Sequence, residues 1–192
     1  MNHDSYDDSY IRGILSTVKT IAMVGASEKE NRPSYFAFKY LLERGYKMIP
    51  VNPGHAGENM LGQRIYARLA DIPELVDMID IFRSSQYALA IVQEALALKT
   101  RPQVIWMQLG VRNDEAAALA EANGMKVVMN RCPKIEYGRL SSEIAWMGVN
   151  TRTLSSKKAT IGGIQRMTLN RTSAQGGATT AADRAQREED GR

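Results

Sequence analysis

The sequence predicts an α/β fold, a Rossmann-like doubly wound parallel sheet in a single domain over residues 1–150, followed by a disordered C-terminal tail over residues 151–192. Short apolar runs alternate along the first part with segments whose apolar residues recur at helical spacing. The 192 residues, 44% hydrophobic and 24% charged, have the size and composition of one globular domain. Residues 151–192 contain no aromatic residue and no proline, a composition that buries too little apolar surface to order the chain.

The first half of the domain alternates between helix and strand. Apolar residues within 11–18 share one helical face, and the run at 20–25 that follows is a buried strand ending in Gly25. A second helical face lies within 35–42, and Gly45 terminates that helix. The apolar run at 46–51 is then the second strand.

The second half continues this alternation. Strands are expected at 78–82, 104–107 and 126–129, with helices between them at Leu89–Leu96 and from Asp114 to Ala122. Apolar strands separated by helices form a parallel sheet covered on both faces, since each crossover is right-handed. Ligands of such sheets bind beyond the carboxyl ends of the strands, so the loops there are the candidates for a site.

The basic excess of the chain lies in the tail. Residues 151–192 hold eight basic and four acidic side chains, which accounts for the whole formal net charge of +4. The neutral domain therefore gives no reason to expect nucleic-acid binding, and no aromatic residues interleave the basic ones of the tail. No apolar run approaches the roughly 18 residues of a membrane span, and the acidic N-terminus is unlike a signal peptide. With Cys132 as the single cysteine, we expect no disulfide, no metal site and a cytoplasmic location.

The loop after the first strand has features of a phosphate-binding turn. Gly25 allows a sharp backbone turn, Ser27 offers a hydroxyl, and Arg32 adds a cation. Ser34 is expected to cap the next helix, whose N-terminal N–H groups suit a phosphate. The alternative is an ordinary strand-to-helix turn with a capping serine.

The same loops lack two features of a dinucleotide site. An NAD site has G-x-G-x-x-G after the first strand, whereas this chain has only Gly25 there. It also has an acidic residue after the second strand, where this chain has Asn52, Pro53, Gly54 and His55. An NADP site keeps the glycines, so both cofactors are disfavoured.

The remaining strand-end loops add polar groups to the same edge. Asn52 offers an amide for adenine or ribose, and His55 either reaches a phosphate or is a solvated loop residue. His3 lies in a terminus expected to fray, and Cys132 is expected to be a buried structural thiol, since nothing places a histidine beside it. The other candidate binding residues in these loops are Phe82, Arg83, Ser84, Gln108 and Gly110.

In order along residues 10–145, the motifs VGAS, RPS, PVNP, DIFR, VIW.Q.GV.N and RCP resemble the small bacterial CoA-binding proteins, which are similar to the N-terminal domain of the succinyl-CoA synthetase alpha subunit. The resemblance implies a Rossmann-like fold and coenzyme A or an acyl-CoA as ligand. It implies that Gly25, Ala26 and Ser27 form the phosphate loop. It places Phe82, Arg83 and Ser84 beside the pantetheine arm, with Gln108 and Gly110 at a nearby turn.

Departures from the synthetase bear on function. His55 stands where the synthetase has a phosphate-contacting lysine, so a fixed charge becomes dependent on pH. The chain has no histidine after His55 to relay phosphate. We therefore expect a non-catalytic carrier, sensor or accessory protein with no catalytic residues and with an unidentified enzyme partner. The alternatives are an NAD(P)-dependent oxidoreductase or other nucleotide-binding enzyme of the same fold, and a thioester enzyme with Cys132 as nucleophile.

Overall fold

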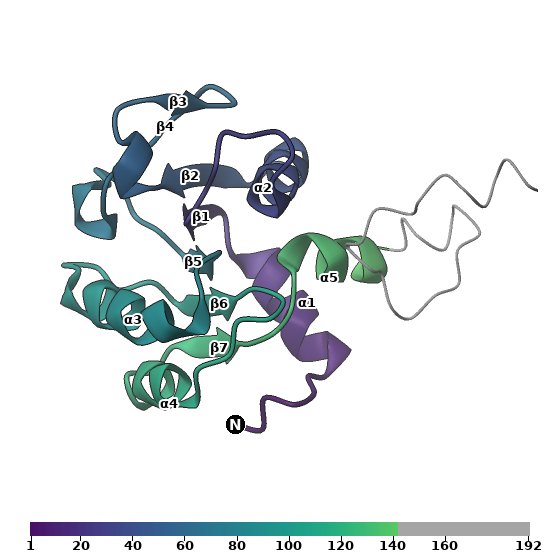
Figure 1. The fold of residues 1–192 in the computed structure, drawn as a ribbon. Helices are drawn as coiled ribbons and strands as arrows, with labels where there is room; N and C mark the ends of the chain where they lie inside the picture. The colour runs from purple at the N-terminus through teal and green to yellow at the C-terminus, as the bar shows by residue number, and fades with distance from the viewer. Residues whose placement is uncertain (142–192) are drawn as a thin grey trace, which may run out of the picture. The chain divides into compact units, whose positions relative to one another are not determined.

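A computed structural model describes residues 1–141, so the expected disordered tail lies outside the described residues. Helices and strands alternate along this part of the chain, as Figure 1 shows. The helices are α1 (Asp8–Thr17), α2 (Pro33–Glu43), α3 (Ala88–Ala97), α4 (Asp114–Ala122) and α5 (Pro133–Leu140). The strands are β1 (Thr20–Val24), β2 (Lys47–Val51), β3 (Asn59–Met60), β4 (Gln63–Arg64), β5 (Met78–Ile81), β6 (Val104–Met107) and β7 (Lys126–Val128).

The main sheet has five parallel strands in the order β2-β1-β5-β6-β7. The chain runs outward from β1 to β2, then crosses back to β5 on the other side of β1, so the strand order reverses between β1 and β5. The strands are buried on both faces, which explains their nearly continuous apolar sequences. The predicted Rossmann-like, doubly wound class is confirmed.

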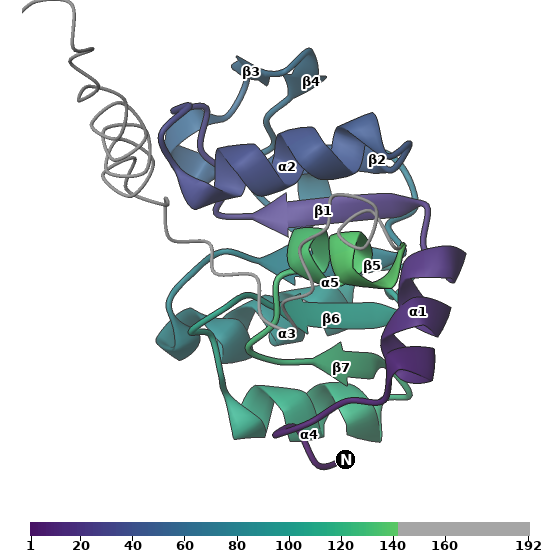
Figure 2. The same cartoon turned by 90° about the vertical axis from the view of Figure 1, so that its right-hand side faces the viewer.

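The helices form two layers, one on each face of the sheet (Figures 1 and 2). One core contains Ile21 and Met23 of β1 together with apolar residues of α1, α2 and α5. The other contains Ala22 of β1 together with residues of α3 and α4. Alternate residues of a strand therefore serve opposite cores, as the two-residue period of a strand requires. None of the helices among residues 1–141 is both long enough and apolar enough to cross a membrane.

Two parts of the described chain were not expected from the sequence. Helix α5 begins with Pro133 at its first turn, but it mixes apolar, charged and glycine residues and has no strong apolar periodicity. The small hairpin β3–β4 has only two residues in each strand, and its turn uses positive φ angles at Leu61 and Gly62. Both segments are too short to leave a clear periodic pattern.

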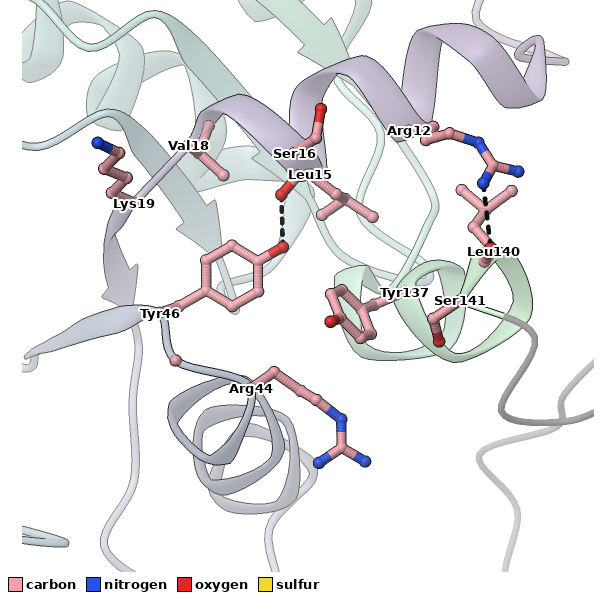
Figure 3. Close-up of a pocket in the computed structure, with 11 residues that line it drawn as sticks. Arg12, Leu15, Ser16, Val18, Lys19, Arg44, Tyr46, Tyr137, Leu140 and Ser141 are labelled. Carbon is pink, nitrogen blue, oxygen red and sulfur yellow. Dashed lines mark hydrogen bonds between the residues drawn. The ribbon is translucent and has the colours of Figure 1, made fainter.

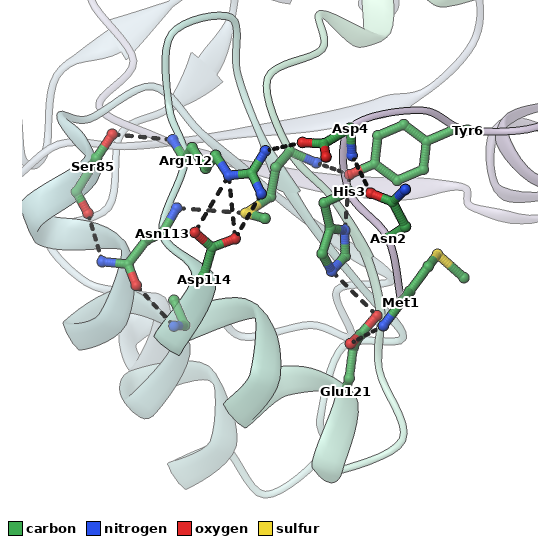
Figure 4. Close-up of polar contacts among 12 residues, drawn as sticks. Met1, Asn2, His3, Asp4, Tyr6, Ser85, Arg112, Asn113, Asp114 and Glu121 are labelled. Atoms are coloured by element: carbon green, nitrogen blue, oxygen red, sulfur yellow. Dashed lines mark hydrogen bonds and ion pairs between the residues drawn. The ribbon is translucent and has the colours of Figure 1, made fainter.

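The N-terminal segment covers the exposed edge of β7. The hydroxyl of Tyr10 accepts from the N–H of Val127 and donates to its carbonyl, both at 3.2 Å, and the hydroxyl of Tyr6 accepts from the N–H of Met129 at 2.7 Å. Figure 4 shows His3 between Tyr6 and Glu121, with Nδ1 2.9 Å from the Tyr6 hydroxyl. The expectation that His3 frays is therefore wrong, because its ring is buried against these partners.

Candidate functional site

The candidate site lies at the carboxyl edge of the sheet, where the strand order reverses between β1 and β5. Gly25 follows β1 with φ +89°, and its N–H donates to the carbonyl of Val51 at 2.9 Å. On the other side, the N–H of Phe82 donates to the carbonyl of Val24 at 2.8 Å. The loops after β1, β2 and β5 therefore start next to one another, at the position where doubly wound sheets bind their ligands.

Gly25 is required by its packing against the loop after β5. A Cβ at this position would lie 2.7 Å from the carbonyl oxygen of Phe82 and 2.8 Å from Cδ of Arg83. Only a glycine permits this approach together with a positive φ. The guanidinium of Arg83 in turn lies 4.9 Å from the ring centroid of Tyr87. This stacking keeps an exposed cation beside the β1 loop.

The β1 loop leads into α2 differently from the sequence-based expectation. Arg32, not Ser34, is the N-cap residue, and Pro33 occupies the first helical position. The hydroxyl of Ser34 accepts from the N–H of Ser27 at 3.2 Å and so ties the loop to the helix. The hydroxyl of Ser27 accepts from the N–H of Lys29 at 3.3 Å. No side chain caps the start of α2. Pro33 has no N–H, and the N–H of Tyr35 donates to the carbonyl of Arg32 at 3.1 Å, so the N–H of Ser34 and the positive end of the helix dipole are what this turn offers to an anion.

The loop after β2 is tied to the β1 loop by Asn52. Its Nδ2 donates to the carbonyl of Ala26 at 2.7 Å, and its Oδ1 accepts from the N–H of Gly54 at 3.0 Å. One N–H and one lone pair of the side-chain amide are therefore engaged within the protein, and contact with adenine or ribose stays a prediction. Pro53 begins a short 3-10 helix, Pro53–His55, that orients the rest of this loop.

His55 faces two carboxylates. Its Nδ1 lies 3.1 Å from Oε2 of Glu58 and 3.6 Å from Oε2 of Glu28. The Oε2 atom of Glu28 is buried and has no hydrogen-bond partner among the described residues. A protonated His55 would compensate these carboxylates rather than add a free positive charge to the site.

Gln108 and Gly110 connect the β6 loop to its neighbours. The backbone N–H of Gln108 donates to the carbonyl of Ile81 at 3.3 Å. Gly110 has φ +78°, and its N–H donates to Oδ1 of Asn130 at 2.8 Å. The hydroxyl of Ser85 accepts from the N–H of Arg112 at 3.0 Å and so ties the β5 loop to the β6 loop.

The side chain of Gln108 points into the protein, toward an acid that sequence reasoning missed. Its Nε2 lies 3.1 and 3.3 Å from the two carboxyl oxygens of Asp80, which is fully buried in β5. Burial raises the pKa of Asp80 to about 8, although the bond from Gln108 opposes the shift. The signal was present in the sequence, because Asp80 is the one charged residue in the run Met78–Phe82.

Cys132 lies beside this pair at the start of α5 and is buried, as expected for a structural thiol. Burial raises its pKa, and the charge of Asp80 acts in the same direction, whereas N–H groups of Ile135 and Lys134 and the Gln108 amide oppose it. The thiol is therefore protonated at neutral pH, which is unfavourable for a nucleophile.

The predicted site residues thus form a continuous edge. Contacts link the β2 loop to the β1 loop through Asn52 and Ala26, and the β1 loop to the β5 loop at Gly25. Exposed apolar side chains also lie on this edge, at the start of α2 and in the loops after β5 and β6: Phe36, Tyr87 and Leu109. The edge therefore combines the positive end of the α2 dipole, cations and apolar surface.

A cavity of about 410 Å³ lies at the opposite edge, between the ends of α1, α2 and α5 (Figure 3). It includes Lys19 and Tyr46, which precede β1 and β2, and none of the predicted site residues. The hydroxyl of Tyr46 donates to the carbonyl of Leu15 at 2.6 Å, and Arg12 donates to the carbonyl of Leu140 at 3.3 Å. These polar groups serve the packing of the helices, so we place the candidate site at the carboxyl edge.

Proteins with similar sequences and folds are known. The chain is 33% identical over 127 residues to the uncharacterized protein YneT of Bacillus subtilis, a match that covers 66% of this chain and 91% of that protein. A solved structure from Thermus thermophilus, described as cell-free ID.343, is 38% identical with a TM-score of 0.66, over 70% of this chain and 99% of that one.

A hypothetical protein of known structure from Pyrococcus horikoshii OT3 is 37% identical with a TM-score of 0.68, over 73% of this chain and 96% of that one. The family model described as CoA binding domain matches residues 19–138. That range contains all five strands of the main sheet and every loop of the candidate site. On this match, and on the fold that accompanies it, the chain belongs to the CoA binding domain family.

Proposed function

We propose that this protein binds coenzyme A or an acyl-CoA at the carboxyl edge of its sheet, as a non-catalytic carrier, sensor or accessory protein. Membership of the CoA binding domain family supports a CoA-binding role. The observation that carries the proposal is the junction at Gly25, where the β1 loop and the β5 loop are in contact at the reversal of strand order. At this junction the aliphatic part of Arg83 lies against Gly25, and Ser27, two residues later, is bonded to Ser34 in the first turn of α2.

The chemistry of this junction suits the phosphates of CoA. The start of α2 has no side-chain cap, so the N–H of Ser34 and the positive end of the helix dipole favour an anion. Arg32 precedes that helix and Arg83 lies across the junction, and guanidinium groups bind phosphate oxygens with charge-assisted hydrogen bonds. The exposed Tyr87 and Leu109 offer apolar surface for the pantetheine arm.

The states of the nearby titratable groups support a non-catalytic role. Cys132 is buried with a raised pKa, Asp80 is fully buried, and His55 is paired with two carboxylates. A nucleophile or general base must reach the substrate, and these groups are engaged within the protein. The proposal includes a partner enzyme, which receives the bound ligand from this protein.

Isothermal titration with CoA, dephospho-CoA, NAD and NADP tests the ligand. We expect CoA to bind and NAD to bind at least tenfold more weakly, because the acidic residue that holds the NAD ribose is replaced by the internally bonded Asn52. Tighter binding of NAD than of CoA would overturn the proposal in favour of a dinucleotide-dependent enzyme.

A pair of arginine variants tests the location. Arg83→Ala should weaken CoA binding by about 1.5–3 kcal/mol, the range for a hydrogen bond to a charged group. Arg44→Ala is the matched control, because Arg44 also stacks on a tyrosine, at 4.6 Å from the Tyr40 ring centroid, but lines the cavity at the other edge. Loss of affinity in Arg44→Ala alone would place the ligand in that cavity and contradict the proposed site.

A further inference from the structure

A buried polar cluster lies beneath the candidate site, formed by Asp80, Gln108 and Cys132. Their exposed fractions are 0%, 5% and 9%, although each is a polar or ionisable residue. Asp80 comes from β5, Gln108 directly follows β6, and Cys132 directly precedes α5. The cluster therefore joins three elements immediately below the loops that we assign to the ligand.

The surroundings of Asp80 contain little that would stabilise a negative charge. Its register neighbours are Met23 in β1 and Trp106 in β6, and the indole N–H of Trp106 donates to the carbonyl of Arg131 instead. The hydrogen-bond donor on the carboxyl is the Gln108 amide, and the titratable group that faces it from α5 is the Cys132 thiol. Among residues 1–141, no cation lies within ion-pair distance of Asp80.

A neutral carboxyl in such a place lowers stability, since an ionised aspartate in the unfolded chain is well solvated. Burial raises the pKa of Asp80 to about 8, so the group changes charge slightly above neutral pH. An apolar residue would fill the same position in a strand without this cost. Buried acids of this kind are concentrated at functional sites, and this one lies under the junction of β1 and β5.

We propose that Asp80 is a positioning residue of the ligand site, which holds the Gln108 amide by accepting from its Nε2 and weakens the binding of an anionic ligand when it is ionised. This inference rests on the proposed function, because it takes the phosphates of CoA as the anion. Asp80 does not touch the ligand in this arrangement. It acts through Gln108 and through its charge.

The distances make the effect measurable. Asp80 precedes Phe82 by two residues, so it lies about 7 Å along the strand from the loop that contacts Gly25. Two charges about 10 Å apart at an effective dielectric constant of about 20 interact strongly enough to change a dissociation constant about tenfold. Ionisation of Asp80 should therefore weaken CoA binding by about that factor.

Titration calorimetry with CoA between pH 6.5 and 9.5 tests the inference on the full chain. The wild type should lose about fivefold in affinity relative to Asp80→Asn as the pH rises from 7 to 9, and should approach a tenfold loss above that range. The phosphates and thiol of CoA titrate equally for both proteins, so the ratio of their affinities isolates Asp80. Asp71→Asn, which removes an exposed carboxylate on the 3-10 helix Leu69–Asp71, should keep the wild-type profile.

A reciprocal measurement needs no variant. If ionised Asp80 weakens CoA binding, then bound CoA must oppose its ionisation by the same factor. The carbon-13 resonance of the Asp80 carboxyl should titrate near pH 8 in the free protein and about one pH unit higher with saturating CoA.

Different outcomes would overturn the proposed function and the role of Asp80. Absence of CoA binding by the wild type at pH 7 would overturn the proposed function. Binding with identical pH profiles for wild type and Asp80→Asn, or an Asp80 titration unmoved by CoA, would overturn the role of Asp80 alone.

Discussion

Gly25 and Gly124 share a backbone conformation but differ in their surroundings. Gly25 has φ +89° and Gly124 has φ +80°. A Cβ at Gly25 would collide with the backbone of the β5 loop, whereas a Cβ at Gly124 would meet nothing within 4 Å. The comparison separates the cost of the left-handed conformation from the cost of the close approach.

We expect Gly124→Ala to lower the free energy of unfolding by about 1–2 kcal/mol, through backbone strain alone. Gly25→Ala should lower it by about 1–3 kcal/mol more, because the β5 loop must move. Urea denaturation measures both, and calorimetry should show weakened CoA binding only for Gly25→Ala. Equal losses of stability in the two variants would show that the β5 loop yields without cost.

Asp80 gives stability a defined dependence on pH. Its pKa is about 8 in the folded protein and about 4 in an unfolded chain. The unfolded state therefore binds fewer protons between these values, so this residue's contribution to stability is complete below pH 4 and is lost as the pH rises to about 8.

Asp80→Asn removes this dependence and keeps an amide partner for Gln108. Its gain in the free energy of unfolding over wild type should grow by about 1.4 kcal/mol per pH unit between pH 4 and 8 and then level off. Chemical denaturation at several pH values measures it, with Asp71→Asn as the exposed control. A difference that is constant with pH would mean that Asp80 is ionised in the folded protein at neutral pH.

The roles of single residues were predictable where they depend on the local sequence. The strand-end position of Gly25 and the burial of Cys132 follow from local sequence. The partners of Ser34, Asn52 and Gln108 do not, because each bonds to a residue brought near by the fold: Ser27, Ala26 and Asp80 respectively. A polar side chain can form hydrogen bonds with many groups, and which of them it contacts is determined by the tertiary structure.

The edge strand β7 is protected by side chains instead of by another strand. Tyr6 and Tyr10 satisfy backbone groups of residues 127 and 129 that would otherwise face solvent. Unpaired strand edges promote association between molecules, so we expect this cover to disfavour pairing with a second copy at β7. Arg112 adds an ion pair to Asp4 at 2.6 Å, visible in Figure 4, which holds the segment in place.

We expect the double variant Tyr6→Phe, Tyr10→Phe to lose about 3–4 kcal/mol of stability, about 1 kcal/mol for each hydrogen bond removed. It should also self-associate at concentrations where the wild type does not, which sedimentation velocity would detect. Tyr35→Phe, which removes an exposed hydroxyl bonded to Glu30, is the control and should do neither. A stable double variant with unchanged sedimentation would show that the hydroxyls are dispensable.

Elements were predictable in proportion to their length and apolar periodicity. The five strands of the main sheet and helices α1 to α4 were all expected, with ends shifted by a few residues. Helix α5 was not predicted, because only part of its surface is apolar and its Leu140 packs against a core formed by residues distant in the sequence. The hairpin β3–β4 depends on a turn at Leu61 and Gly62 rather than on periodicity.

The extent of the domain gives a prediction for the tail. The family match ends at residue 138, and the composition of residues 151–192 does not favour a core of its own. Deleting residues 170–192 should leave the melting temperature and the CoA affinity nearly unchanged, as measured by differential scanning calorimetry and isothermal titration. Deleting residues 1–10, which removes Tyr6 and Tyr10, should lower the melting temperature clearly. A drop of several degrees from the C-terminal deletion would contradict this division.

Helices α1 and α5, the first and the last of the described residues, contact each other. Asp8 of α1 pairs with Arg139 of α5 at 2.7 Å, and Arg12 donates to the carbonyl of Leu140. A ribosome adds roughly 5–20 residues per second, so on the order of ten seconds separate the synthesis of these two helices. During that interval the apolar side of α1, with Ile11 and Ile14, has no α5 to cover it. We therefore expect α1 to reach its final packing only after the last helix has emerged.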